Sequence, residues 1–256
     1  MLHKVKTLKE YKLNGIDGEI GKVHDLYFDD QFWTIRYLVA NTGSWLTDNI
    51  VLISPYALAT AIKAEKHIDI SLTKKQIENS PPLESDKPVS QQFERDYYAY
   101  YGWPAYYTGS FMWGIYPQIR REEEITQEAN LSAPTWDPHL RSANEVSDYY
   151  VHANDGDIGH VVDIIIDDET WAIRYLIIET SNWWSGKKVM VSPRWIDRVI
   201  WSKSKVYINL SQEAIKQSPE YSEEALLTRD YETALHRHYN RQGYWQEELV
   251  AKEHSL

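Results

Sequence analysis

Residues 155–161 read Asp-Gly-Asp-Ile-Gly-His-Val, and this stretch decides the fold because residues 17–23 read almost the same, Asp-Gly-Glu-Ile-Gly-Lys-Val. We call the separation of Asp17 from Asp155 the repeat spacing. The same spacing separates Trp-Thr-Ile-Arg-Tyr-Leu at residues 33–38 from Trp-Ala-Ile-Arg-Tyr-Leu at residues 171–176. Solenoid repeats have periods of about 20–50 residues, so a spacing this long indicates a duplicated domain.

The repeat divides the 256 residues into four predicted segments. They are a first domain over residues 1–82, a helix and aromatic linker over residues 83–138, a second domain over residues 139–219, and a C-terminal helix and tail over residues 220–256. The stretch from Ser110 to Pro138 contains prolines and an acidic run, which predicts a linker with little regular structure.

Each copy reads as β structure. Val, Ile, Tyr and Trp are enriched over residues 158–166 and 171–180, and turn-forming Asp-Gly and Asp-Asp pairs bound these runs. A tight second turn gives a hairpin register in which two charge pairs face each other across the strands: Asp25 with Arg36, and Asp163 with Arg174. We expect these to be structural ion pairs that contribute about 0.2–1 kcal/mol each.

Both faces of this predicted hairpin are largely apolar, so both faces need a cover. A small β-barrel meets this requirement, with one face lining its interior and the other face under a helix or a partner domain. Ser-Pro pairs at residues 54–55 and 192–193 predict short helices after the hairpins, with Ser as the cap. The predicted fold class is therefore mainly β, with two small barrels.

An amphipathic helix is predicted beyond each barrel. Apolar side chains recur at helical spacing in two places: Phe93, Tyr97, Tyr100 and Tyr101, and then Leu227, Tyr231, Ala234 and Leu235. The second set follows the first at slightly less than the repeat spacing, which indicates a short length difference after the barrels. Stripes of this width suit packing against a sheet face or against the other copy.

The aromatic composition is unusual, with 11 Trp and 19 Tyr but only 4 Phe. Trp and Tyr combine an apolar body with a polar group, so they suit interfaces as well as cores. A tryptophan in a polar loop either folds back over its own domain or anchors a partner. Five tryptophans outside the barrel cores are the candidate partner-binding residues: Trp45, Trp183, Trp184, Trp103 and Trp113.

The chain has no Cys, which excludes disulfides, thiolate zinc sites and a cysteine nucleophile and fits a reducing compartment. Its net charge of −11 argues against direct binding to nucleic acid or to anionic lipid. No stretch approaches the roughly 18 apolar residues of a membrane span. We therefore expect a cytoplasmic protein.

Sequence motifs for chemistry are absent. There is no phosphate-binding glycine loop, no nucleophile elbow and no paired-histidine zinc motif, so no catalytic residue and no cofactor is predicted. The acidic turns at residues 17–30 and 155–168 could supply oxygen ligands for calcium, but they lack the EF-hand spacing. Turn formation and charge pairing account for these aspartates, so no metal site is predicted.

The runs Asp-Gly-x-Ile-Gly-x-Val-x-Asp, Trp-x-Ile-Arg-Tyr-Leu and Val-x-x-Ser-Pro, with the Asp-Asp turn, resemble the PRC-barrel domain. The resemblance covers residues 2–82 and 140–219 and is nearest to bacterial tandem PRC-barrel proteins of uncharacterised function. It implies the small, bent β-barrel of the photosynthetic reaction-centre H subunit and of the C-terminal domain of the ribosome maturation factor RimM. The H subunit has a membrane helix and RimM has a different N-terminal barrel, so neither function transfers residue by residue.

The hypothesis that fits these features is a non-enzymatic protein-interaction or scaffold protein, a homodimer with an unidentified protein partner. One alternative is a small-ligand or metal-binding protein, or an enzyme, that uses a cleft between the barrels. Another alternative, by analogy with RimM, is a ribosome-associated assembly factor.

Overall fold

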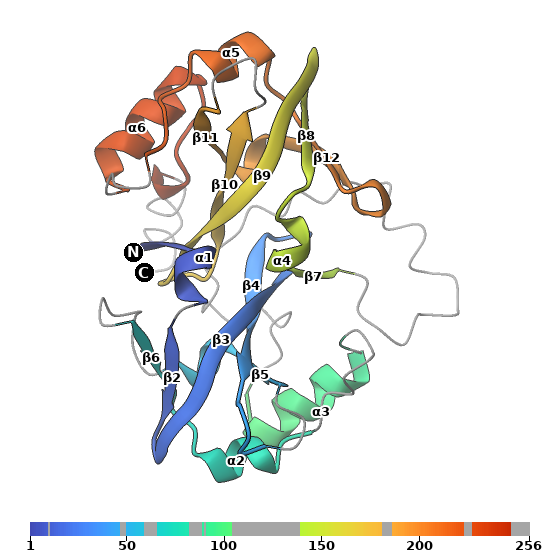
Figure 1. Cartoon of the computed structure of the whole chain (residues 1–256), viewed down its shortest axis with the longest axis vertical. Coiled ribbons are helices and arrows are strands. Elements are labelled where there is room, and N and C mark those ends of the chain that lie inside the picture. Colours follow the sequence, from blue (N-terminus) through green and yellow to red (C-terminus); the bar gives the residue numbers. More distant parts are fainter. Residues whose placement is uncertain are drawn as a thin grey trace. The chain divides into compact units, whose positions relative to one another are not determined.

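The structure is a computed structural model of the 256-residue chain (Figure 1). It describes residues 1–9, 11–46, 50–58, 66–81, 89, 91–103, 139–180, 186–222 and 227–246. Most of the predicted linker and the end of the predicted tail, from residue 247 onward, therefore lie outside the described residues. The described part is mainly β and contains two sheets.

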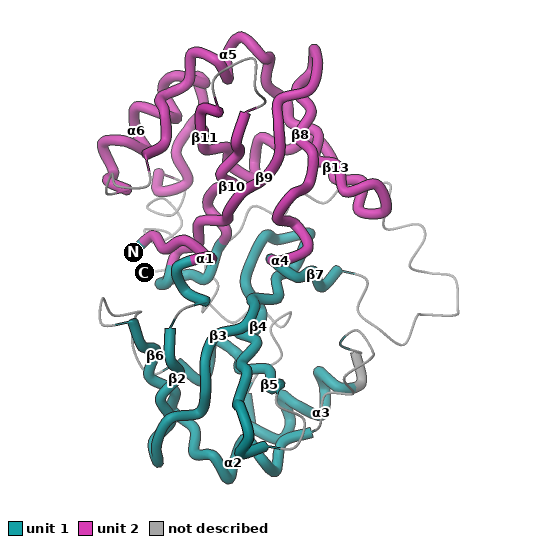
Figure 2. Tube along the Cα trace, in the orientation of Figure 1, with its two compact units in different colours: residues 1, 7–143, 168–172 teal, residues 2–6, 144–167, 173–256 magenta. Residues whose placement is uncertain are grey.

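The chain forms two compact units (Figure 2). Unit 1 consists of residues 1, 7–143 and 168–172, and unit 2 consists of residues 2–6, 144–167 and 173–256. Each unit contains one of the two sheets.

Unit 1 has a six-stranded sheet in the order β5-β4-β3-β2-β6, in which β7 also pairs with β3. Its strands are β2 (Lys12–Gly15), β3 (Gly18–Asp29), β4 (Thr34–Asn41), β5 (Ile50–Ile53), β6 (His67–Asp69) and β7 (Leu140–Ser142). Neighbours are antiparallel except β2 and β6. Its helices include α2 (Lys74–Glu78), α3 (Gln91–Tyr101) and a 3-10 turn (Pro55–Ala57) that Ser54 caps as predicted.

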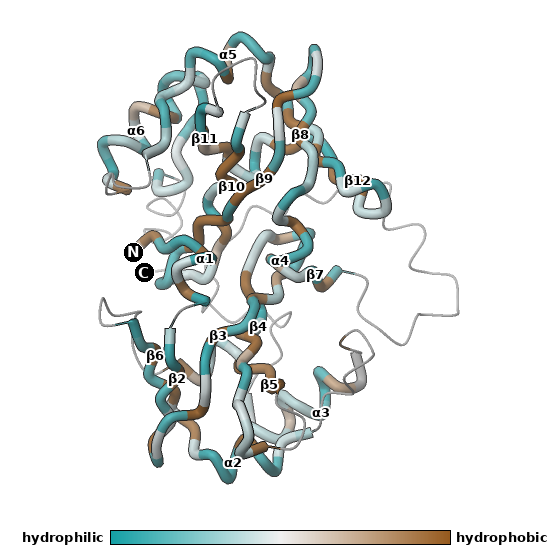
Figure 3. Tube along the Cα trace, viewed as in Figure 1, coloured by the Kyte–Doolittle hydropathy of each residue, from teal (hydrophilic) through white to brown (hydrophobic). Residues whose placement is uncertain are grey.

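Unit 2 has a seven-stranded sheet in the order β11-β10-β9-β8-β13-β12, in which β1 also pairs with β9. Its strands are β1 (Leu2–Lys4), β8 (Tyr150–Ala153), β9 (Gly156–Asp167), β10 (Ile173–Thr180), β11 (Lys188–Val191), β12 (Ile196–Ile200) and β13 (Lys205–Ile208). Its helices include α5 (Gln212–Lys216), α6 (Arg229–His238) and 3-10 turns at Pro193–Trp195, capped by Ser192, and at Trp201–Lys203. Apolar residues concentrate along β9 and β10 (Figure 3).

Two strands, β1 and β7, each belong to a different sheet from the next strand along the chain. β1 is followed by α1 (Val5–Leu8) and then by β2 of unit 1, yet β1 pairs with β9 in unit 2. β7 is followed by α4 (Ala143–Val146) and then by β8 of unit 2, yet β7 pairs with β3 in unit 1. The exchange is reciprocal, so we call β1 and β7 the exchanged strands.

The two exchanged strands take equivalent places in the two sheets. Leu2 lies opposite Asp167 in one pairing, and Leu140 lies opposite Asp29 in the other. Leu2 is separated from Leu140, and Asp29 from Asp167, by the repeat spacing of the sequence. The exchange therefore follows the internal repeat.

The predicted closed barrels are not seen, because neither sheet closes within the part of the chain that the structure describes. The hydrogen-bonded path ends at β5 and β6 in unit 1, and at β11 and β12 in unit 2. A helix helps to enclose the core of unit 1: Tyr97 and Tyr98 of α3 pack with Tyr37, Val39 and Leu52 of the sheet. This cover buries the β4 side chains that face α3, and β4 as a whole is buried at every position except its last residue.

The predicted hairpin register is wrong, and the same error occurs in both units. In unit 1, Asp25 lies opposite Val39. A four-residue turn joins Asp29 to Thr34, and Arg36 forms a β-bulge, an extra residue with no opposite partner in the ladder. The longer turn and the bulge together shift each cross-strand pair away from the predicted one. In unit 2, Asp163 lies opposite Ile177 rather than Arg174.

The predicted apolar stripe of the second helix is wrong at Ala234, although Leu235 is buried and Tyr231 is partly buried. Ala234 is exposed in α6, whereas Glu232, Leu235 and His236 are buried. The helices α3 and α6 correspond at the full repeat spacing rather than at the shorter one, since buried Glu94 stands where Glu232 stands.

Candidate functional site

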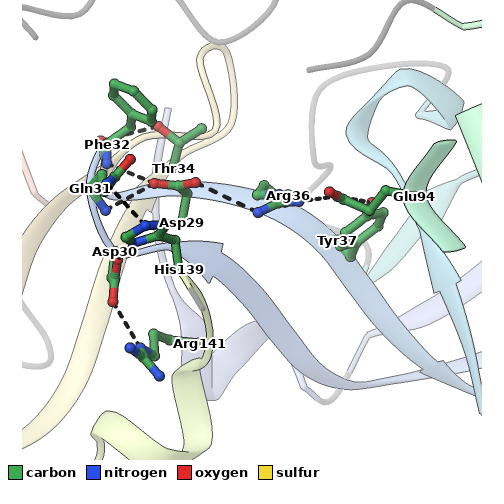
Figure 4. A network of polar contacts seen from close by, with 10 residues as sticks. All are labelled: Asp29, Asp30, Gln31, Phe32, Thr34, Arg36, Tyr37, Glu94, His139 and Arg141. Atoms are coloured by element: carbon green, nitrogen blue, oxygen red, sulfur yellow. Dashed lines mark hydrogen bonds and ion pairs between the residues drawn. The ribbon is translucent and has the colours of Figure 1, made fainter. Parts of the chain in front are cut away.

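The turn between β3 and β4 is built around the carboxylate of Asp29 (Figure 4). Its Oδ1 accepts hydrogen bonds from the backbone N–H groups of Gln31, at 2.9 Å, and Phe32, at 3.0 Å. Aspartate favours turns because its short side chain can satisfy backbone donors two or three residues on. Trp33 completes the turn with a left-handed backbone (φ 53°), and its N–H donates to the Asp29 carbonyl at 2.8 Å.

Arg36 is the centre of the network in Figure 4, and its side chain is fully buried. One guanidinium nitrogen lies 3.6 Å from Asp29 Oδ2, and another donates to Glu94 of α3. The neighbouring Tyr37 hydroxyl donates to the same Glu94 carboxylate at 2.6 Å. The bulge at Arg36 lets two consecutive residues of β4 reach one carboxylate on the helix, because a bulge redirects the side chain that it carries.

Burial and nearby charge keep the Tyr37 hydroxyl protonated. Burial raises the pKa of Tyr37 well above its ordinary value, and the nearby Glu94 carboxylate raises it further. Tyr37 therefore remains a hydrogen-bond donor across the physiological pH range. The same desolvation raises the pKa of the adjacent Tyr98 to about 12.

A second, more exposed cluster joins the turn to the exchanged strand β7. Asp30 accepts hydrogen bonds from His139 Nδ1, at 2.9 Å, and from Arg141 Nε, at 2.8 Å. The other ring nitrogen of His139 lies 3.1 Å from the side-chain amide of Gln31. Figure 4 shows that Asp29 and Asp30 point in different directions, one toward Arg36 and the other toward Arg141.

Unit 2 contains a corresponding network with different details. Arg174 binds Asp167 at 2.8 Å through Nη2. The hydroxyls of Tyr175 and Tyr244 each donate to Glu232 Oε1 at 2.9 Å.

The positive charges around Glu232 are also arranged differently from those in unit 1. Arg229 lies 2.9 Å from Glu232 Oε2. The guanidinium of Arg174 stacks 3.8 Å from the centre of the Tyr244 ring, so a cation–π contact is present. A carboxylate on a helix thus holds a strand tyrosine in both units.

His236 lies beside this second network, where the equivalent position of unit 1 has Tyr98. Its Nδ1 lies 3.0 Å from the Gln242 carbonyl, and its Nε2 lies 3.0 Å from the Tyr175 hydroxyl. The rings of Trp195 and Trp245 meet it edge to face, with centroids 5.1 and 5.0 Å away. Burial among these groups lowers the pKa of His236 to about 4, so the imidazole is neutral at pH 7.

The aspartates predicted as ion-pair partners bind the exchanged strands and their continuations. Asp25 accepts hydrogen bonds from the backbone of Leu26, at 2.8 Å, and from the hydroxyl of Ser142, the last residue of β7. Asp163 accepts from the backbone of Ile164, at 2.8 Å, and of Lys6, at 3.1 Å. Burial raises the pKa of Asp163.

Sequence reasoning missed the carboxylates that pair with the two buried arginines. Asp29 and Glu94 take the place of Asp25 as ion-pair partners of Arg36, and Asp167 takes the place of Asp163 beside Arg174. The glutamates had one detectable signal: each follows its tyrosine by 57 residues. The pair therefore recurs at the repeat spacing.

Two of the predicted partner-binding tryptophans lie within the described residues, and both contact their own unit. Trp45 Nε1 donates to the Ile20 carbonyl at 2.6 Å, so this loop folds back on its own sheet. Trp103 stacks on Tyr101, at 4.5 Å, and on Tyr56, at 5.9 Å. The remaining candidates, Trp113, Trp183 and Trp184, lie outside the described residues.

In each unit, the network attaches a helix to the sheet through hydrogen bonds between a helix glutamate and a strand tyrosine. In both units the central glutamate is buried and receives several donors. Among the described residues, no group of three or more His, Asp or Glu side chains is arranged to hold a metal ion. No helix in this part of the chain is long and apolar enough to cross a membrane.

Replacing Glu94 with Gln is expected to lower the free energy of unfolding by about 3–5 kcal/mol, because a buried arginine loses one of its carboxylates. Glu78→Gln, at an exposed position of α2, is the matched control and is expected to leave stability unchanged. Chemical denaturation followed by circular dichroism measures both. Equal stability of the Glu94→Gln variant and the wild type would show that the ion pair does not hold α3.

The neutral state of His236 predicts a pH dependence of stability. The folded chain resists protonation until about pH 4, whereas the unfolded chain binds the proton near the ordinary pKa of 6.5. The free energy of unfolding should therefore fall by about 3 kcal/mol as the pH drops from 6.5 to 4. In His236→Gln this component of the slope should vanish, and in the exposed control His24→Gln it should persist. An unchanged slope in His236→Gln would contradict the assignment.

Residues 141–215 match the PRC-barrel domain family, and no curated protein matches the sequence. The matched segment begins in β7, runs through β8 to β13 and ends within α5. It thus includes a strand that pairs in unit 1, as expected if β7 is the first strand of the domain along the chain. The chain contains a PRC-barrel domain at residues 141–215.

Proposed function

We propose that this chain is a non-enzymatic protein-interaction or scaffold protein built on two PRC-type domains. The observation that carries the proposal is that the central glutamates and the Arg36 ion-pair network are buried and bind neighbouring side chains. The side chain of Arg36 has no exposed surface, and Glu232 is 2% exposed. A general acid or base must come within hydrogen-bond reach of its substrate, and groups this deeply buried do not offer that reach.

The second PRC-type domain, over about residues 2–82, is part of this proposal. Its support is the repetition of individual interactions at one spacing in the chain. The strand order of unit 1 matches five consecutive strands of unit 2, and the exchanged strands take equivalent places in both. The hydrogen bond of Tyr37 with Glu94 recurs as that of Tyr175 with Glu232. Duplication of one ancestral domain accounts for this repetition.

The partner in this proposal is a protein, and the site of action is the cytoplasm of a bacterium. The net charge of −11 disfavours a partner whose surface is dominated by phosphate. Two domains that fasten helices onto sheets through buried networks provide rigid surfaces. Rigid surfaces suit binding because less conformational entropy is lost when a partner docks.

The full-length chain used as bait in a nuclease-treated lysate of its source cell should capture a specific protein. That protein, once purified, should bind the chain at a fixed stoichiometry in calorimetry. The control bait is the same chain after denaturation, which should capture nothing specific. Loss of specific capture, together with conversion of a metabolite by the purified chain, would contradict a non-enzymatic interaction role.

A further inference from the structure

The hydroxyl of Tyr175 lies between two proton acceptors in the buried part of unit 2. The hydroxyl donates to Glu232 Oε1 at 2.9 Å, and His236 Nε2 lies 3.0 Å from the same phenol oxygen. The Gln242 carbonyl, 3.0 Å from His236 Nδ1, can only accept a hydrogen bond, so it places the proton of the neutral imidazole on Nδ1. Nε2 therefore keeps a lone pair, and two acceptors face the single proton of the phenol.

This arrangement is the one that the one-electron oxidation of a phenol requires. A phenol that has lost an electron is a strong acid, so its proton leaves with the electron when a base lies within hydrogen-bond reach. Burial raises the pKa of Tyr175, which keeps the hydroxyl protonated until that moment. Burial also lowers the pKa of His236 to about 4, but an oxidised phenol is a far stronger acid, so the proton transfer remains favourable.

Aromatic rings connect this site to the surface of unit 2. The Trp245 ring is partly exposed, and its centroid lies 5.0 Å from that of His236 and 5.2 Å from that of Tyr244. The Tyr244 hydroxyl donates to the same oxygen of Glu232 as the Tyr175 hydroxyl. Because the chain has no Cys, tryptophan and tyrosine are the side chains from which one electron is most easily removed. An electron can therefore pass from Tyr175 to an oxidised Trp245 over short contacts.

The equivalent tyrosine of unit 1 has no imidazole beside it. Tyr98 stands where His236 stands, and burial raises the pKa of Tyr98 to about 12, so this side chain is not a base at pH 7. Tyr37 donates to Glu94 at 2.6 Å, but the same carboxylate forms an ion pair with the buried Arg36. This positive charge lowers the proton affinity of the carboxylate. Tyr37 is therefore a matched control within the same chain.

We propose that Tyr175 and His236 form a one-electron oxidation site that quenches small oxidising radicals from the solvent. The oxidising radical takes one electron from Trp245 and is reduced. An electron from Tyr175 then restores Trp245, while the phenolic O–H bond breaks and an N–H bond forms at His236 Nε2. The products are the reduced oxidant, a neutral tyrosyl radical and an imidazolium, so atoms and charge balance. This activity goes beyond the proposed partner role and does not depend on it.

Pulse radiolysis of the full chain with azide radicals tests the site, because these radicals oxidise tryptophan. In the wild type, the absorption of the tryptophan radical should decay into that of a tyrosyl radical. The tyrosyl signal should persist, because Tyr175 is fully buried and cannot meet other radicals. Tyr175→Phe should lose the persistent tyrosyl signal, and the control Tyr37→Phe should keep it. A persistent signal of wild-type size in Tyr175→Phe would overturn the proposal.

The solvent isotope effect tests the proton transfer without any substitution. After full exchange, the tyrosyl radical should form more slowly in heavy water than in ordinary water, since the phenolic bond breaks in that step. His236→Gln should also slow this step, whereas the exposed control His24→Gln should leave its rate unchanged. Equal rates in the two solvents, or a wild-type rate in His236→Gln, would show that the imidazole does not take the proton.

Discussion

The exchange of β1 and β7 is the constraint on which the rest of the structure depends. Each sheet includes a strand that stands far away in the chain, and this strand pairs with the buried C-terminal part of β3 or β9. Buried backbone groups must be hydrogen-bonded, so neither sheet is complete without its exchanged strand. Asp25 and Asp163 secure the exchange, because their carboxylates bind Ser142 and the backbone of Lys6. Each sheet therefore takes one strand from the other half of the chain.

The buried networks begin where the exchanged strands end their pairing. Asp29 and Asp167 lie opposite the first residues of β7 and β1, and both also bind the arginine of the following strand. The next residue along that strand is a tyrosine that binds a helix glutamate. In each unit, the exchanged strand, the turn aspartate, the arginine, the tyrosine and the helix glutamate are thus linked in one continuous series of contacts. Its buried ionic groups are held by several partners each, as the high free-energy cost of an unpaired buried charge requires.

The sequence predicted the positions of elements well and their partners poorly. The alternation and turn residues located the hairpin, and the Ser-Pro pairs located the capped turns that Ser54 and Ser192 begin. The register failed for two reasons. The turn after Asp29 is longer than predicted, and the bulge at Arg36 directs its side chain to Glu94, which is distant in the sequence. The choice of sheet for β1 could not be read from the sequence, since β3 and β9 have similar sequences and offer equivalent edges. The site glutamates lie 57 residues from their tyrosines, too far for any local pattern to pair them.

Cysteine cross-linking tests the exchange most directly, because the chain has no Cys of its own. Tyr27 lies directly opposite Ser142 in the exchanged arrangement, and opposed residues of antiparallel strands are close enough for a disulfide. Without the exchange, Lys4 would occupy the place of Ser142. The measurement is disulfide formation within single chains of Y27C/S142C and of Y27C/K4C under mild oxidation. The exchange predicts rapid cross-linking of the first variant only, and cross-linking of the second variant instead would contradict it.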